Sequence, residues 1–255
     1  MRSIRTVLFT FIFAALFPAV SLYAAEKGDC ESPQAATDLR HCSFAGRSLE
    51  GIDLQGSILD GVDLSNAKLS GCNLTGSSLR KADLKWAILT ECQMEQVDMT
   101  EADLFHTTFD GANLSNSQFT RANMFGANLN EVFAEQADFT TAYMKDIAME
   151  ESNFNRSKFV GCFMQRAVLI GSKLRDSTFY NVVLTGGALE NSDFTGANIS
   201  NSLLNGARLD NANFSESLLQ NTRFNNAVLT GANFSRAREI PDHLLKMLND
   251  ENIEH

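Results

Sequence analysis

The sequence predicts an all-β solenoid, a fold in which the chain winds into stacked coils around one apolar interior. The first observation is a period of five: Leu, Phe, Met or Ile stands at every fifth position from Leu39 to Phe234, with Ala134 as the one exception. The second is that the residue two places before each of these is nearly always small, with Arg47 as the clear exception. The third is that the frame holds through 40 positions without an insertion.

Neither regular element explains a period of five. A strand repeats its faces every two residues and an α-helix every 3.6, so a helix would spread this pattern around its whole surface. Leucine-rich and hexapeptide solenoids have other periods. In contrast, a side of five residues that ends in a corner can point the same two side chains inward each time. An interior built this way accounts for the 19 Phe without an aromatic binding site.

Units such as "GANLS", "GANFS" and "KADLK" resemble the alanine–aspartate/asparagine–leucine units of the pentapeptide-repeat proteins. The resemblance covers residues 37–236. It implies the fold of that family, a right-handed quadrilateral parallel β-helix in which five residues form one side and twenty complete a coil. The repeat region would then contain about ten coils, stacked at the inter-strand spacing of ~4.8 Å.

Ala134 breaks the pattern of large inward residues, and Phe133 stands directly before it. We expect Phe133 to point outward, because the frame resumes unshifted at Phe139. The alternative is a local bulge that turns Phe133 inward.

Residues 1–25 have the layout of a secretory signal peptide. Arg2 and Arg5 precede the apolar run "VLFTFIFAALF", and small residues follow it. The alternative is an uncleaved anchor, but the run is shorter than the ~20 residues that a membrane-spanning helix needs. We expect cleavage between Ala24 and Glu26, no membrane span afterwards, and a protein that is periplasmic or secreted from a bacterial cell.

Both ends of the repeat region need a cover, because the terminal coils of a solenoid expose backbone and interior. We expect residues 26–36 to form an irregular N-terminal cap. Residues 237–255 are expected to form a C-terminal helical cap and tail, with an amphipathic helix that begins near Pro241. The apolar side of that helix would carry Leu244, Leu245 and Leu248. The alternative is a helix that binds a partner.

Four of the five cysteines, Cys42, Cys72, Cys92 and Cys162, occupy the small inward position, where we expect buried thiols. Cys72 and Cys92 would stack in adjacent coils. Their separation would permit a disulfide, but both side chains would point the same way, which makes the dihedral angle awkward. Cys30 and Cys42 are the better disulfide candidate, since Cys30 lies in the loose cap and the expected compartment is oxidising.

No catalytic, cofactor-binding or metal-binding motif stands out. The four histidines are scattered, and the sequence has no phosphate-binding glycine loop, nucleophile elbow or CxxC. The glycines fall in the last place of their pentapeptides, where a tight turn explains them. We therefore expect no enzyme and no cofactor, although a solenoid could still assemble a site from residues twenty apart.

Folding the sequence on a twenty-residue pitch places a set of outward apolar residues in one strip. The set comprises Trp86, Phe105, Phe125, Tyr143, Phe163, Val183 and Leu203. One interpretation is ordinary packing between like neighbours, and the other is an interface with a protein partner or with a second copy of the chain. The same side carries Asp63, Asp83 and Asp103, which would hydrogen-bond the turn backbone or bind a cation or a basic partner.

Composition limits the class of partner. The chain has 31 Asp and Glu against 21 Lys and Arg, a formal net charge of −10, which disfavours direct nucleic-acid binding. We expect an exported, non-catalytic scaffold or protein-interaction module. The family resemblance implies an alternative, since some acidic pentapeptide-repeat rods mimic duplex DNA and bind type II topoisomerases. The export signal argues against that alternative, because the topoisomerase is in the cytoplasm.

Overall fold

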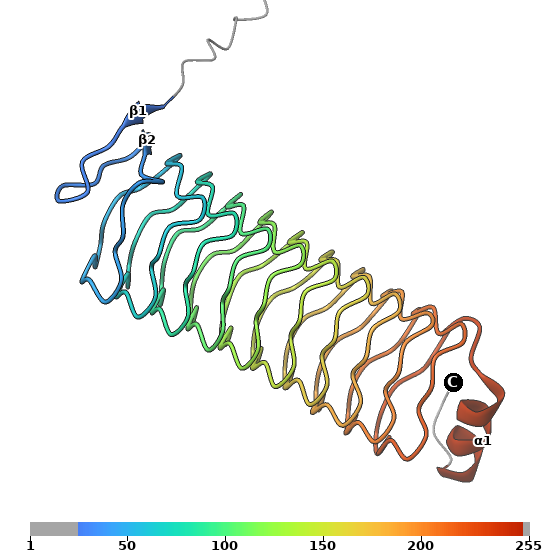
Figure 1. The fold of residues 1–255 in the computed structure, drawn as a ribbon. Coiled ribbons are helices and arrows are strands. Elements are labelled where there is room, and N and C mark those ends of the chain that lie inside the picture. Colours follow the sequence, from blue (N-terminus) through green and yellow to red (C-terminus); the bar gives the residue numbers. More distant parts are fainter. Residues whose placement is uncertain (1–24, 252–255) are drawn as a thin grey trace, which may run out of the picture.

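The computed structural model describes residues 25–251 and shows a rod of stacked coils with a helix at its C-terminal end (Figure 1). The short strands β1 (Glu26–Lys27) and β2 (Thr37–Asp38) pair in parallel at the N-terminal end. From there single parallel bridges join the residue directly before each inward residue to the one twenty later, up to Leu218 and Arg238. The expected signal peptide, residues 1–25, lies outside the described residues except for its last position.

Neighbouring coils are joined by a recurring set of backbone hydrogen bonds. The N–H of the inward residue Leu64 donates to the carbonyl of Asp83 at 2.7 Å, and the N–H of Asp83 donates to the carbonyl of Val62 at 3.0 Å. A third bond, from the N–H of Ala67 to the carbonyl of Leu64 at 3.0 Å, closes the corner. Because the same bonds recur along the rod, the coils stay in one register.

Each corner requires a left-handed backbone at one position, two residues after the inward residue. A four-residue turn with φ > 0 at its third residue suits glycine, and Gly61 has φ +70°. Bulky residues take the same conformation at other corners, with φ 60° at Trp86 and 52° at His106. The corner glycines are therefore explained by the turn, as the sequence predicts.

The interior is a single apolar column. All 40 inward residues are buried, including Ala134, whereas the side chain of Phe133 is 59% exposed. This confirms the prediction that Phe133 points outward. Inward phenylalanines stack from coil to coil, with 5.0 Å between the ring centroids of Phe139 and Phe159 and an interplanar angle of 2°.

Arg47 breaks the rule of small residues because its side chain ties the N-terminal segment to the rod. One guanidinium nitrogen donates to the carbonyl of Cys30 at 2.6 Å, and another lies 3.7 Å from a carboxylate oxygen of Glu31. The guanidinium also lies over the ring of Phe44, 5.4 Å from its centroid. A disulfide between Cys30 and Cys42 fixes the same segment to the first coil.

At the other end, α1 (Asp242–Glu251) packs on the last coil (Figure 1). Leu244 and Leu248 are fully buried against the interior, and Leu245 is half-buried. The backbone N–H of Phe224 donates to Nε2 of His243 at 3.1 Å. In earlier coils the corresponding N–H donates to a backbone carbonyl nineteen residues later, in the next coil. No further coil follows Phe224, so the imidazole of His243 accepts the hydrogen bond in place of that carbonyl.

The structure corrects the expectation of buried thiols at two positions. Cys72 and Cys92 are joined in a disulfide, with a Cα–Cα distance of 4.6 Å. The stacking of adjacent coils brings both sulfurs into the same small interior space, which outweighs the parallel direction of the two side chains. Cys162 is a buried free thiol, and burial raises its pKa to about 12.

Within residues 25–251, no helix has the length and apolar character that a membrane crossing requires.

Candidate functional site

The structure brings the predicted strip of outward apolar residues together and adds one residue to it. We call this surface the aromatic stripe; it comprises Trp86, Phe105, His106, Phe125, Tyr143, Phe163, Val183 and Leu203. Trp86 is 53% exposed and Tyr143 is 41% exposed, and the other members are partly buried by one another. The stripe therefore presents a continuous apolar surface to solvent.

Four aromatic side chains form the end of the stripe nearest the N-terminus. The indole of Trp86 stacks on the imidazole of His106, with 4.3 Å between centroids and an interplanar angle of 7°. Phe105 stacks on Phe125 at 5.4 Å. The rings of Phe105 and His106 meet edge to face at 4.4 Å, so the two stacks form one cluster.

Gly126 makes room for this cluster. It occupies the corner one coil after His106, and a Cβ built there would lie 2.5 Å from Cε1 of the imidazole. Sequence reasoning missed His106 because histidine was not counted as an apolar residue. The signal that finds it is its spacing of twenty residues from Trp86, which places it at the same corner of the next coil.

The middle of the stripe continues without a break. The ring centroids of Phe125 and Tyr143 are 6.2 Å apart, and those of Tyr143 and Phe163 are 5.6 Å apart, nearly parallel at 3°. The ammonium group of Lys145 lies 5.9 Å from the centroid of Phe125, within the range of a cation–π interaction. Parallel bridges then lead from Phe163 to Val183 and on to Leu203.

A shallow groove of about 360 Å³ lies along the end of the stripe nearest the C-terminus. Val183 and Leu203 line one side of the groove, and a row of asparagines at the preceding corner lines the other. Arg223 lies at the end of the groove. The amide nitrogen of Asn221 donates to the side-chain oxygen of Asn201 at 3.1 Å. The groove is thus apolar on one side, amide-lined on the other and cationic at its end.

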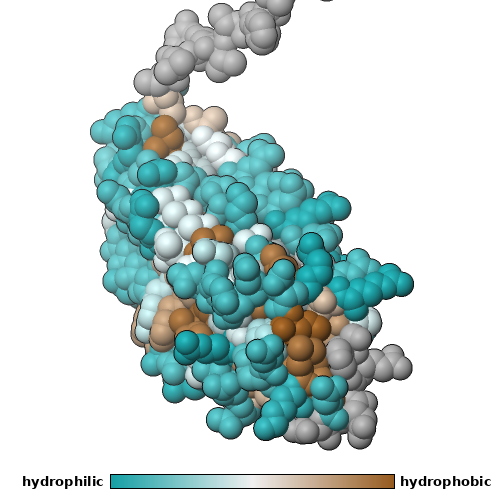
Figure 2. Space-filling model, turned by 90° about the vertical axis from the view of Figure 1, so that its right-hand side faces the viewer, coloured by the Kyte–Doolittle hydropathy of each residue, from teal (hydrophilic) through white to brown (hydrophobic). Residues whose placement is uncertain are grey.

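Other exposed large hydrophobic residues are dispersed over the rod. Among the described residues these are Ile88, Phe133, Tyr180 and Val228. The end view in Figure 2 shows a surface that is mostly hydrophilic, with separate hydrophobic areas. The aromatic stripe is distinguished by its continuity over successive coils.

The stacked aspartates of the same side hydrogen-bond the turn backbone. The carboxylates of Asp63, Asp83 and Asp103 accept from the backbone N–H two residues later, at 3.0, 3.1 and 3.3 Å respectively. The Ser65 hydroxyl and the Ser65 N–H both bond Asp63 and hold the pKa of its carboxyl below the ordinary value. The ammonium group of Lys85 lies 2.7 Å from Asp83 and 3.6 Å from Asp103. These contacts match the turn interpretation.

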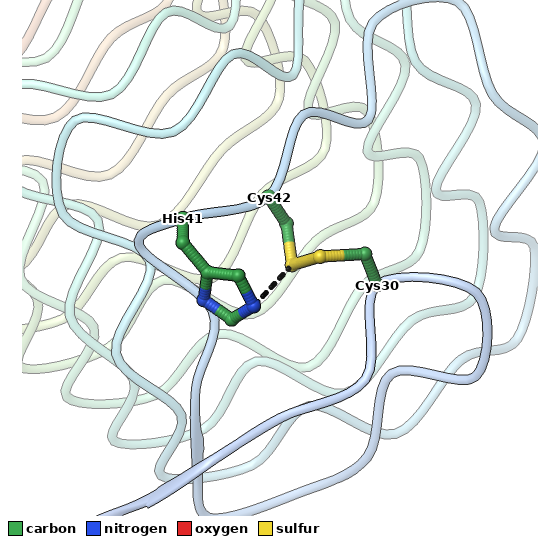
Figure 3. Close-up of side chains that lie close together, drawn as sticks. All are labelled: Cys30, His41 and Cys42. Carbon is green, nitrogen blue, oxygen red and sulfur yellow. Dashed lines mark hydrogen bonds between the residues drawn. A yellow bond between two sulfur atoms is a disulfide. The ribbon is translucent and has the colours of Figure 1, made fainter.

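A cluster of two cysteines and a histidine lies at the N-terminal cap (Figure 3). The ligand atoms of Cys30, His41 and Cys42 lie within 4.8 Å of one another, and Nε2 of His41 is 3.7 Å from Sγ of Cys42. The two sulfurs are joined at 2.03 Å, with a Cα–Cα distance of 5.4 Å. A cysteine binds metal as a thiolate, so the disulfide uses both sulfur ligands and the cluster does not form a metal centre in this state.

The twenty-residue pairing and the five-residue sides agree with a family model. Residues 37–119 match the model of the pentapeptide repeat region. The model of eight pentapeptide repeat copies matches residues 102–140, 117–156, 149–186, 184–211 and 207–238. The chain belongs to the pentapeptide-repeat family. Members of this family form right-handed quadrilateral β-helices, and this is the fold class of the rod.

Solved structures similar to this pentapeptide-repeat protein are themselves pentapeptide-repeat proteins or share that fold. HetL from the cyanobacterium Nostoc sp. strain PCC 7120, involved in heterocyst differentiation regulation, is 22% identical, covers 74% of this chain and 87% of its own, and has a TM-score of 0.52. QnrB1, a plasmid-mediated fluoroquinolone resistance protein, is 17% identical, with coverage of 82% and 99% and a TM-score of 0.45. A pentapeptide repeat protein from the Arabidopsis thaliana thylakoid lumen is 25% identical, with coverage of 55% and 76% and a TM-score of 0.35.

Among curated proteins, none matches the sequence significantly. The similarity to HetL shows the fold alone.

Proposed function

We propose that this pentapeptide-repeat protein is an exported, non-catalytic scaffold or interaction module that binds a protein partner through the aromatic stripe. It acts in the periplasm or outside the cell. The observation that carries the proposal is the continuity of the stripe, since exposed apolar surface that extends over several coils marks an interaction site. A rod of about ten coils, covered by the N-terminal segment and α1, supports that surface.

The stripe is suited to binding because its side chains are already ordered. Trp86 is stacked on His106, and Tyr143 on Phe163, so little rotamer freedom remains to be lost when a partner covers them. Aromatic side chains held in this way contribute strongly to interfaces, and pre-organisation reduces the entropic cost of association.

The non-catalytic part of the proposal rests on the partners of the histidines. Within the described residues, His41 lies beside a disulfide, His106 is held between aromatic rings and His243 accepts a backbone hydrogen bond. Each imidazole thus contacts a structural partner, and in the part of the chain that the structure describes no hydrogen bond joins any of the three to a Ser or Thr hydroxyl or to the free thiol.

Site-specific photo-crosslinking in intact cells tests the proposal. A photoreactive amino acid at position 163, in the stripe, is expected to give defined protein adducts. The same amino acid at Asn153, which lies on a different side of the coil, is the matched control and is expected to give none. Identical adduct patterns from the two positions would contradict a specific interface at the stripe.

Cell fractionation tests the compartment. We expect the mature chain in the envelope or the medium. Recovery in the cytoplasm with residues 1–25 retained would favour the second candidate, a DNA-mimicking protein that binds a type II topoisomerase. The net charge of −10 is the observation that favours this candidate.

A further inference from the structure

We propose that the partner at the aromatic stripe is a second copy of this chain, bound side by side in antiparallel orientation. This inference rests on the proposed function, since it names the occupant of the same surface. It follows from an asymmetry of charge along one column of the rod. Successive parallel bridges order the column as Asp63, Asp83, Asp103, Asn123, Tyr143, Phe163, Val183, Leu203 and Arg223.

The column is acidic at one end, apolar in the middle and basic at the other end. At the acidic end the ammonium group of Lys85 pairs with Asp83 and Asp103, so the three carboxylates and this one ammonium carry a net charge of −2. At the other end Arg223 is exposed, and in the described part of the chain it forms no ion pair. Two copies of this column are therefore complementary when they face each other in opposite directions, because the basic end of one then lies toward the acidic end of the other.

The sides of the column do not block the approach of a second rod. The preceding corner carries short side chains over the apolar coils: Thr141, Gly161, Asn181 and Asn201. On the other side of the column, Gln165 and Thr185 are uncharged, and Lys145 lies over Phe125. The corner that follows carries Asp146 and Arg166, which form an ion pair with each other at 2.6 Å, and then the glycines Gly186 and Gly206. The apolar column is therefore accessible to another flat face.

An antiparallel arrangement pairs the apolar residues of the column and brings Arg223 near one of the three aspartates. A two-fold axis that lies in the interface, perpendicular to the rod and level with the gap between Phe163 and Val183, places these two residues opposite each other across the two copies. The same axis places Tyr143 opposite Leu203. It also places Arg223 opposite Asn123 of the other copy. Asp103 lies one coil, or ~4.8 Å, from Asn123, so the long side chain of Arg223 can reach the Asp103 carboxylate. Symmetry makes each of these contacts twice.

A parallel arrangement would lose this complementarity. A two-fold axis along the rod places each residue level with its own equivalent, so the acidic ends would face each other and the two Arg223 side chains would also face each other. Like charges at an interface disfavour association. The charge asymmetry therefore selects the antiparallel orientation.

Sedimentation velocity of the purified chain, from low to high micromolar concentration, tests whether the dimer forms. The contact covers one narrow side of the rod, so we expect a weak, reversible dimer. Phe163→Glu is expected to abolish it. Phe133→Glu, at an exposed position outside the stripe, is the matched control and is expected to leave it unchanged. A wild-type chain that is monomeric at every concentration would overturn the proposal.

Cysteine crosslinking tests the orientation. A mixture of Tyr143→Cys and Leu203→Cys is expected to form disulfides between the two variants, because the antiparallel arrangement sets these positions opposite each other. Tyr143→Cys alone is expected to crosslink poorly, since its equivalents would be about three coils, or ~14 Å, apart along the rod. Efficient crosslinking of Tyr143→Cys to itself would overturn the antiparallel orientation. Phe133→Cys mixed with Leu203→Cys is the control for random collision.

Charge reversal tests the register. Asn123→Arg would set two guanidinium groups opposite each other and is expected to raise the dimer Kd by ~10-fold. The fold accepts an arginine at this kind of position, because Arg208 occupies the corresponding place, directly before an inward residue, on another side of the rod. Adding Arg223→Glu to Asn123→Arg is expected to restore the wild-type Kd. No recovery in the double variant would overturn this register.

The failure of this inference is distinguishable from the failure of the proposed function. A monomeric chain whose position 163 crosslinks to a different protein in cells would overturn self-association and retain the interaction module. A monomeric chain with no specific adduct from position 163 would overturn both.

Discussion

Gly126 and His106 illustrate how one residue of the solenoid shapes its neighbour twenty positions away. The corner at Gly126 needs a left-handed backbone, and glycine takes this conformation without cost. Its missing side chain also leaves the space into which the His106 ring fits. The packing of the aromatic stripe thus depends on the absence of a methyl group.

Replacing Gly126 by Ala is expected to have two effects. The left-handed φ would destabilise the fold by about 1–2 kcal/mol, and the new Cβ would displace His106 from the indole of Trp86. Trp86 is the only tryptophan in the chain, so fluorescence reports this displacement directly.

The matched control is Gly61→Ala, which has the same sign of φ but no atom within 4 Å of the new Cβ. We expect it to lower the midpoint of thermal unfolding by a similar amount and to leave the fluorescence spectrum unchanged. A spectral change of equal size in both variants would show that His106 is not held against Gly126.

The cysteines give a second prediction at the scale of single residues. With Cys30–Cys42 and Cys72–Cys92 both joined, only the buried thiol of Cys162 remains, and its raised pKa makes the reactive thiolate rare at neutral pH. Alkylation followed by intact mass measurement should detect no modified thiol in the native chain and one after denaturation without reductant.

Three modified thiols after such denaturation would show that one of the two disulfides is absent, and five would show that neither forms. Cys30→Ser provides the control, since it frees Cys42 and is expected to add one thiol to the count.

The sequence predicts single residues well where the repeat frame decides their orientation. Phe133 points outward because the frame continues through Ala134. Whether two stacked cysteines bond depends on small displacements of the sulfurs within the interior, and the frame carries no information about these. The prediction for Cys72 and Cys92 was wrong for that reason.

At the scale of elements, α1 satisfies the backbone of the coil that it covers. His243→Ala would leave the N–H of Phe224 without its acceptor, which costs about 1 kcal/mol. Hydrogen exchange is the measurement. We expect the Phe224 amide to exchange about five-fold faster, in proportion to that loss.

Lys246→Ala is the control on the same helix, because Lys246 is exposed and lies away from the last coil. Its effect on the Phe224 amide should be negligible. If the Phe224 amide exchanged at the same rate in the wild type, in His243→Ala and in Lys246→Ala, His243 would have no role in covering the last coil.

The turn formed by Asp63 and Ser65 gives a prediction that involves pH. The pKa of the Asp63 carboxyl is lowered in the folded chain, so the carboxylate stabilises the fold at pH values above the ordinary pKa of aspartate. This stabilisation is lost as the pH falls through the lowered pKa. Ser65→Ala removes the hydroxyl bond, so the pKa of Asp63 should rise. A carboxyl NMR titration measures this change.

Ser70→Ala, at the corresponding position after Lys68, is the control and should leave the titration of Asp63 unchanged. A pKa for Asp63 that is equal in the wild type and in Ser65→Ala would rule out the hydroxyl as the main cause.

At the scale of the whole molecule, the sequence predicts the fold because one short pattern is repeated without interruption. The position of every inward residue from Leu39 to Phe234 follows from the five-residue frame. The stripe is predictable in part, since the twenty-residue pitch brings its members together. The stacking of His106 on Trp86 and the groove beside Val183 depend on side-chain rotamers, which the period does not specify.

Export gives a prediction for the whole chain. If residues 1–25 are a cleaved signal peptide, intact mass of the mature protein should correspond to a chain that begins at Ala25 or Glu26. Replacing Ala24 and Ala25 by bulky residues should slow this cleavage. A mature chain that retains Met1 or lacks only the initiator methionine would contradict export by this route.

The pairing of each residue with the one twenty later also governs how such a protein can lengthen. Duplication of a twenty-residue segment would extend the rod and keep every later side chain facing the same direction. Duplication of a single five-residue unit would keep the interior filled but turn everything beyond it by a quarter of a revolution. The two halves of the apolar column would then face different directions, so growth by whole revolutions preserves the recognition surface, whereas growth by single sides divides it.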